Sequence, residues 1–171
     1  MAVGNLEFIK SASGTSITTL EITDCFSADY DVYYVSITKV DVAANPLLYF
    51  RFIDSGGTVI TGTEYDRAHL NMFSYTAFSE GRSTGETRIP IGYANGSGTA
   101  DLTGLSAYIF NPYDSSSYTF TTSQNSSYST SGLQGMKSIG VHKTAEQLSG
   151  VAITVNTGSL ESITANIFGV K

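Results

Sequence analysis

Tryptophan is absent from this sequence of 171 residues, and cysteine, proline and charged residues are scarce. The single cysteine, Cys25, excludes an intramolecular disulfide, and we interpret it as a small buried apolar residue at a strand end. Only 14% of the residues are charged, against roughly a quarter in ordinary soluble domains. The nine Lys and Arg residues are scattered, and the net charge is −6. We therefore expect no nucleic-acid partner, because such a groove needs clustered basic side chains.

A secretory leader and long apolar runs are also lacking. The opening residues MAVGNLEFIK contain no basic region followed by a long apolar stretch. This predicts synthesis in a cytoplasm without a signal peptide. No later segment is apolar for long enough to span a bilayer as a helix, so we expect no membrane partner. The sequons at Asn95 and Asn125 are therefore interpreted as turn chemistry rather than as glycan acceptors.

Patterns typical of catalytic and metal sites are missing as well. The two histidines, His69 and His142, are far apart and lack metal-ligand spacing, so we interpret both as ordinary surface or core residues. The sequence contains no phosphate loop or dinucleotide fingerprint. We expect no catalytic, cofactor-binding or metal-binding residues.

Paired acidic residues are the remaining candidates for chemistry. Asp29 and Asp31 precede a predicted strand, where Asp commonly satisfies free backbone amides in a turn. Calcium binding there would need six or more oxygen ligands, and only two clustered carboxylates are available. A glycosidase would use two carboxylates, for which Asp24, Glu64 and Asp66 are further candidates. The turn interpretation is favoured, and the chain is predicted not to be an enzyme.

Alternation of apolar and polar residues is what this sequence has in abundance. Two long strands are predicted at Val32–Val42 and Leu47–Asp54, joined by a turn at Pro46. Both faces of the second strand are largely apolar, so we expect it to be central and covered on both sides. About nine or ten strands separated by Gly, Pro and Asn turns predict one all-β domain over residues 1–171. The predicted architecture is an antiparallel β-sandwich of the jelly-roll type with little helix.

Two stretches fit this alternation poorly. Residues 62–98 are expected to form a long loop or insertion, with one helical turn at Glu64–Phe73 and a brief strand at Arg88–Gly92. Residues Gln124–Gly132 are interpreted as a loop rich in Ser, Tyr and Asn. Long loops in compact domains are usually functional or held by a partner, so the first stretch is a candidate for partner contact.

Aromatic residues suggest a recognition surface. Tyr113, Tyr118, Phe120 and Tyr128 are predicted to lie in or beside loops, close to amide side chains. Aromatic faces with amides bind sugars, and Tyr also anchors protein interfaces. The alternative interpretation is that these rings simply cover the end of the sandwich. Since charged residues are depleted in interface cores, the low charge is typical of subunits of a larger assembly, and we expect a homo-oligomer.

Three segments carry a resemblance to a known family: Leu6–Ile37, the aromatic turn IFNPYDSSSYT at Ile109–Thr119, and the ending Ser149–Lys171. A strand of the DYDVY type, an aromatic NPY turn and a terminal pair of strands around a Gly turn follow in this order. The sequence thereby resembles the small β-sandwich structural proteins of tailed bacteriophages, especially those of marine phages. The resemblance brings no active-site residues.

What the resemblance implies is a non-enzymatic virion protein made in the host cytoplasm. Its expected role is a capsid decoration or head-fibre subunit whose partners are further copies and the major capsid or tail proteins. The alternative is a tail or fibre-tip adhesion module that binds a host surface glycan or receptor. A glycosidase is the least favoured function.

Overall fold

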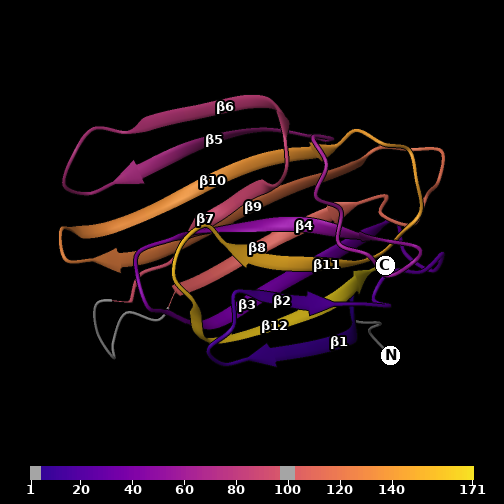
Figure 1. Cartoon of the computed structure of the whole chain (residues 1–171), viewed down its shortest axis with the longest axis horizontal. Helices are drawn as coiled ribbons and strands as arrows, with labels where there is room; N and C mark the ends of the chain where they lie inside the picture. The colour runs from indigo at the N-terminus through magenta and orange to yellow at the C-terminus, as the bar shows by residue number, and fades with distance from the viewer. Residues whose placement is uncertain (1–4, 97–102) are drawn as a thin grey trace.

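A computed structural model describes residues 5–96 and 103–171, which form twelve β-strands in two antiparallel sheets (Figure 1). No helix that could cross a membrane occurs in these ranges. The predicted all-β sandwich is confirmed, with twelve strands rather than nine or ten. The strands are β1 (Leu6–Gly14), β2 (Thr19–Ile22), β3 (Val32–Val42), β4 (Leu47–Asp54), β5 (Tyr65–Phe73), β6 (Ser79–Glu86), β7 (Ile89–Tyr93), β8 (Thr103–Phe110), β9 (Thr119–Ser129), β10 (Gly132–His142), β11 (Leu148–Val155) and β12 (Leu160–Val170).

Eight of the strands follow the order of a jelly roll. Sheet A has the order β1-β12-β3-β8-β9-β10-β5-β6, and sheet B has the order β2-β11-β4-β7. When β5, β6, β9 and β10 are set aside, β1 pairs with β12, β2 with β11, β3 with β8, and β4 with β7. This nested order is the one expected when a long antiparallel hairpin wraps into two sheets.

The other four strands are two inserted hairpins, β5–β6 and β9–β10. They leave the chain at separate points, yet they lie side by side, because β5 pairs with β10 along its whole length. Together they extend sheet A beyond sheet B, and the β5–β6 hairpin forms the upper edge of the molecule in Figure 1. The longer sheet therefore has one half that belongs to the jelly roll and one half that is made of insertions.

The core lies between the two sheets. Strands β3 and β4 have the predicted boundaries and lie in opposite sheets. Their inward side chains include Tyr33 and Ile37 of β3 and Phe50 and Phe52 of β4, which are fully buried. The outward side of β4 was expected to be covered as well; on that side Ile53 is fully buried, whereas Tyr49 is only partly buried.

Residues 62–98 are not a long loop. Their described part contains β5, β6 and β7, and the helical turn expected at Glu64–Phe73 is strand β5. The expected insertion agrees with the strand order, since β5 and β6 are additions to the jelly roll. Residues Gln124–Gly132 are not a loop either, because most of them belong to β9. Residues 97 and 98 lie outside the described residues.

Strand β9 has an inverted polarity, which explains why it does not look like a strand in the sequence. Its inward, buried side chains are polar, whereas Phe120 and Tyr128 point outward and are exposed: the buried set is Thr119, Thr121, Ser123, Asn125 and Ser127. Some of the buried groups hydrogen-bond to β7, which packs directly on β9. The Ser123 hydroxyl donates to the Ile91 carbonyl at 3.1 Å. Gly92 permits this close approach, since a Cβ there would lie 2.5 Å from the Asn125 side chain.

Asn125 connects the two sheets. Its side-chain oxygen accepts the N–H groups of Tyr93 at 3.3 Å and Met136 at 2.9 Å, and its amide donates to the Tyr93 carbonyl at 2.8 Å. The interpretation of Asn125 as a turn residue is therefore wrong. Asn95, the other sequon residue, is also buried and donates to the Ser127 hydroxyl at 3.2 Å. Buried amides and hydroxyls thus replace apolar packing where β7 crosses β9.

Candidate functional site

The face of sheet A that points away from sheet B carries two rows of mainly apolar side chains. An antiparallel sheet that packs one face on a core usually turns polar residues to water on the other. Here the strand register aligns outward residues across the sheet. Row 1 consists of Leu6, Val170, Val32, Phe110, Phe120, Val141 and Asp66. Row 2 consists of Phe8, Phe168, Tyr34, Tyr108, Thr122, Ile139, Ala68 and Arg82.

Row 2 contains a continuous chain of aromatic rings. Ring centroids lie 5.7 Å apart between Phe8 and Phe168, 6.0 Å between Phe168 and Tyr34, and 5.3 Å between Tyr34 and Tyr108. Tyr108 also lies 6.4 Å from Phe110 of row 1. Because neighbouring rings attract one another in edge and offset contacts, they hold each other in position on the surface.

The apolar character ends at the next row. Row 3 has polar or charged side chains at every position except Leu70, and it consists of Ser11, Asn166, Ser36, Ser106, Gln124, Lys137, Leu70 and Glu80. The register thus places the two apolar rows beside a polar row, and exposed apolar side chains recur beyond row 3, at Tyr128 and Leu133. Singly scattered apolar residues are normal on a protein surface, whereas a contiguous patch marks an interaction site.

The surface is concave at one end of the two rows. A groove of about 760 Å³ lies over β9, β10, β5 and β6, and its mainly apolar lining includes Ala68, Phe120, Ile139 and Val141. Charged side chains also line the groove. Asp66 pairs with Lys143 at 2.8 Å, and Arg67 pairs with Glu86 at 3.1 Å, while Arg82 is exposed on β6. The inserted hairpins therefore form an apolar depression beside the projecting rings of the jelly-roll half.

The four contact residues predicted from the sequence do not form one site. Phe120 belongs to row 1 and lines the groove, and exposed Tyr118 precedes it at the start of β9. Tyr128 lies at the other end of β9, about 27 Å away for eight residues of strand. Tyr113 follows β8 and is partly buried against the core. Phe120 lies on β9 beside the turn that precedes the strand, whereas the loop expected around Tyr128 is wrong, because Tyr128 lies on β9.

Several residues of the surface were missed in the sequence, chiefly Phe8, Tyr34, Phe168 and Ile139. The signal that could have found them is a second apolar or aromatic residue on the side of a strand opposite the core. Val32 and Tyr34 form such a pair on β3, and Tyr108 and Phe110 form one on β8.

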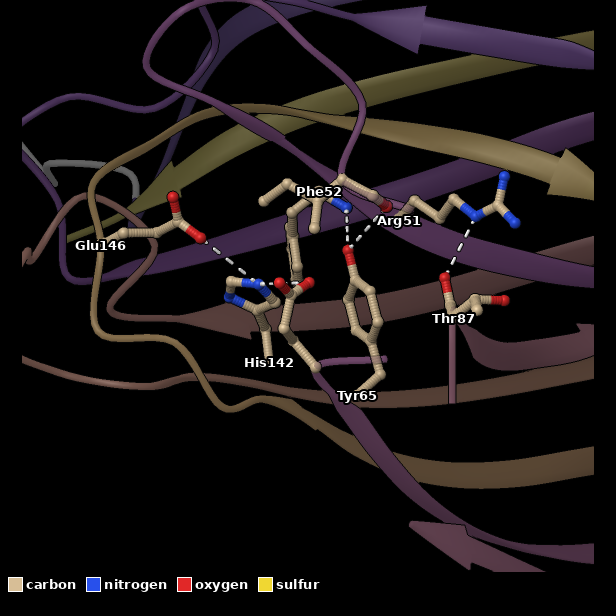
Figure 2. A network of polar contacts seen from close by, with 8 residues as sticks. Arg51, Phe52, Tyr65, Thr87, His142 and Glu146 are labelled. Carbon is tan, nitrogen blue, oxygen red and sulfur yellow. Dashed lines mark hydrogen bonds and ion pairs between the residues drawn. The ribbon is translucent and has the colours of Figure 1, made fainter. Parts of the chain in front are cut away.

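A fully buried histidine lies where β10 ends and β5 begins (Figure 2). The Nε2 atom of His142 is 3.5 Å from Glu146 Oε1 and 3.9 Å from Glu64 Oε2, and neither ring nitrogen has a hydrogen-bond partner in the described residues. The ring packs against Tyr65 and Phe52, with centroids 5.1 Å and 5.9 Å away. Two aromatic rings thus pack against the imidazole, and two carboxylates lie beside its Nε2 atom.

Burial controls the titration of this cluster. It lowers the pKa of His142 below the ordinary 6.5, although the charge of Glu64 acts in the opposite direction. It also raises the pKa of Glu146, with further contributions from the charges of Glu64 and Asp54. The His142 ring is fully buried against Tyr65 and Phe52, so it packs as part of the protein interior.

The pKa of His142 makes stability depend on pH. The unfolded chain protonates this imidazole near pH 6.5, whereas the folded chain does so at a lower pH, so stability present above pH 6.5 is lost as the pH falls through the folded-state pKa. We expect His142→Gln to remove a slope of at most about 1.4 kcal/mol per pH unit. Urea denaturation between pH 7.5 and 5.5 measures this effect.

Two other groups belong in the same experiment. Burial also lowers the pKa of His69, so His69→Gln serves as a second variant, and the double variant should have the flattest profile. Glu146 acts in the opposite sense, because its raised pKa favours folding as the pH falls. Unchanged slopes in both single variants and in the double variant would contradict the assignment.

The acidic residues considered for chemistry are dispersed. The Ser27 hydroxyl donates to Asp29 Oδ2 at 3.1 Å, and the Asp29 N–H donates to Ser27 Oγ at 3.3 Å, as expected for a turn. Glu64 faces His142, whereas Asp66 pairs with Lys143. In residues 5–96 and 103–171, no three His, Cys, Asp or Glu side chains are placed to hold a metal ion.

Cys25 is buried, as the sequence predicted. Its thiol donates to the Ile22 carbonyl at 3.3 Å. Burial raises the pKa of this thiol to about 12, so it remains protonated and unreactive near neutral pH.

Comparison with known proteins adds a weak structural similarity. No protein-family model and no curated protein matches the chain. Among solved structures, the chain is similar to a fructofuranosidase from Schwanniomyces occidentalis complexed with fructosylnystose, with 5% sequence identity and a TM-score of 0.20. The similarity covers 98% of this chain and 35% of that chain. At this TM-score it carries no argument about function.

Proposed function

We propose that this chain is a non-enzymatic structural protein of a tailed-bacteriophage virion, which attaches to neighbouring subunits through the outer face of sheet A. The observation that carries the proposal is the pair of apolar rows across that face, which no described part of the chain covers. The cores of protein interfaces are rich in aromatic side chains and depleted of charged ones, and rows 1 and 2 have this composition except at Asp66 and Arg82. The resemblance to phage β-sandwich structural proteins supports the same function.

A capsid decoration or head-fibre subunit fits this geometry best. A rigid sandwich can give its sheet face to one neighbour and its loops to another. Support for a non-enzymatic role comes from the ionisable groups, since His142 and Cys25 are enclosed and Asp66 is paired with Lys143. None of these groups stands free in the groove.

The location of the chain on purified particles tests the proposal. We expect gold-labelled antibody against this chain to decorate the head in electron micrographs, with pre-immune antibody as the control. Label at the tail tip would favour the alternative, a glycan-binding module, and would make the groove beside Phe120 the first place to look. Intact particles that carry no label and lack the chain by mass spectrometry would overturn both.

A further inference from the structure

We infer that the outer face of sheet A binds the same face of a second copy of this chain, in a dimer with two-fold symmetry. The inference rests on the proposed function, because it names the partner that would bind the outer face of sheet A.

The exposed area is that of a dimer interface. Five side chains in rows 1 and 2 are about half exposed: Leu6 at 49%, Phe8 at 58%, Tyr108 at 42%, Phe120 at 47% and Ile139 at 57%. At about 100 Å² for each half-exposed large side chain, these five and their partly buried neighbours present on the order of 700 Å². A stable interface buries about 800 Å² per partner, whereas the largest apolar patch of a monomer is typically about 300–600 Å².

The two ends of the rows have opposite shapes. At the β1 edge, Leu6 and Phe8 project into solvent. At the β5–β6 end, the groove has an apolar floor that includes Ile139 and Val141. A face with a projecting end and a hollow end complements itself when the second copy is turned so that each projecting end enters a hollow.

A two-fold axis parallel to the strands produces this arrangement. The axis lies between the stacked faces and passes over the boundary of β8 and β9, the middle of the eight strands. Rotation about it reverses the strand order but keeps each residue's position along its strand. Strand β1 then faces β6, β12 faces β5, β3 faces β10, and β8 faces β9. Each row meets the same row of the partner, and the contact is isologous.

This rotation pairs a large side chain with a small one at two positions of row 2. Phe168 faces Ala68 and Tyr108 faces Thr122, so these rings enter spaces left by the hairpin half, whereas Tyr34 faces the larger Ile139. In row 1, Val32 faces Val141, and Phe110 faces Phe120. Alternation of large and small residues lets two sheets interdigitate at a spacing of about 10 Å.

The charges of the face also agree with this pairing. Row 2 brings Arg82 onto the ring of Phe8, a favourable contact between a cation and an aromatic face. In row 3, Lys137 faces Ser36, and Glu80 faces Ser11. No like charges meet in rows 1 to 3. In this dimer the inserted hairpins of each copy cover the jelly-roll half of the other copy.

A charge exchange tests the inference on the whole chain. We expect the purified chain to sediment as a dimer, and Phe8→Arg to raise the dissociation constant at least about 100-fold, because it would face Arg82 of the second copy. Adding Arg82→Glu to Phe8→Arg should restore the dimer. These positions lie on opposite edge strands of sheet A, so the rescue cannot act within one chain. Ser13→Asp, exposed on the same face outside the rows, is the matched control.

Cross-linking tests the register. In the variant with Tyr34→Cys and Ile139→Cys, a thiol cross-linker spanning about 10 Å should join two copies, since that is the distance between packed sheets. Within one chain the two positions are three strands apart, about 14 Å, and the native Cys25 is buried. Each single variant should remain unlinked, because the dimer places each position opposite the other one.

The outcomes separate this inference from the proposed function. A monomer at 100 μM (on the scale of ordinary weak association), a dimer unaffected by Phe8→Arg, or equal cross-linking of the single variants would overturn the inference. Circular dichroism of every variant confirms that the fold is retained, and Ile139→Asp is a second disrupting variant within the groove. A monomeric chain that still labels the phage head would overturn the dimer alone. A dimer that is absent from particles would overturn the virion function alone.

Discussion

Phe50→Ala is expected to lower the free energy of unfolding by about 3–5 kcal/mol. Phe50 is fully buried on β4, an interior strand of sheet B, where it lies opposite Ile153 of β11 and Ile89 of β7. Truncation removes the ring's contacts and leaves a cavity. Hydrogen bonds on both sides of β4 hold the strand in place, so the sheets cannot close over the space.

Urea denaturation at neutral pH measures this loss, and Tyr49→Ala is the matched control. Tyr49 precedes Phe50 on the outer side of β4, where the guanidinium of Arg88 lies 4.0 Å from its ring centre. That substitution should cost about 1 kcal/mol, since it removes a partly exposed contact. Equal losses in the two variants would show that the inward side of β4 does not form the core.

Asn125→Ala is expected to cost about 3 kcal/mol, although it removes only a small polar side chain. The substitution leaves the buried Met136 N–H and the partly buried Tyr93 N–H and carbonyl without their partner. Unsatisfied buried groups are expensive, because the unfolded chain can hydrogen-bond them to water. The contact between β7 and β9 should loosen first.

Hydrogen exchange distinguishes this effect from a general loss of stability. The Tyr93 and Met136 amides should lose protection in Asn125→Ala by more than the global change accounts for. Ser123→Ala is the control on the same strand, since Ser123 is buried and makes one hydrogen bond to Ile91; it should cost about 1 kcal/mol. Unchanged protection at both amides would contradict the bridging role of Asn125.

The strands that could be predicted from the sequence are those that bury apolar residues on one side. β3 and β4 have the expected boundaries, and Leu105, Ala107 and Ile109 of β8 point to the core as their alternation indicated. For such strands the period of two is visible locally. The jelly-roll class follows from the number of such strands and the turns between them.

The inserted hairpins could not be predicted in the same way. β9 buries hydroxyls and an amide that hydrogen-bond to β7, and glycine at Gly92 lets the backbones approach. Those partners are distant in the sequence. The polar residues of β9 therefore predicted a loop where the chain forms a strand. Strand β5 has no clean alternation, and its conformation is set by pairing with β10.

The candidate surface was only partly foreseen for a related reason. Aromatic contact residues were expected, and Phe120 is one of them. The rows, however, exist only because eight strands from the whole chain are in register. Register is a tertiary property, and one residue of slippage would send Tyr34 or Tyr108 to the opposite face.

The nested strand order has a consequence for how the chain folds as it leaves the ribosome. In the described sheets, β1 is hydrogen-bonded to β12 alone and β2 to β11 alone. The first strands to be synthesised therefore cannot pair until the last strands have been made. Hairpin β9–β10 can close at once, but non-local pairing of this kind makes folding slow, in the range of about milliseconds to seconds. Because β12 lies between β1 and β3, neither apolar row is continuous until this strand is inserted. The proposed dimer therefore requires that both copies have finished folding.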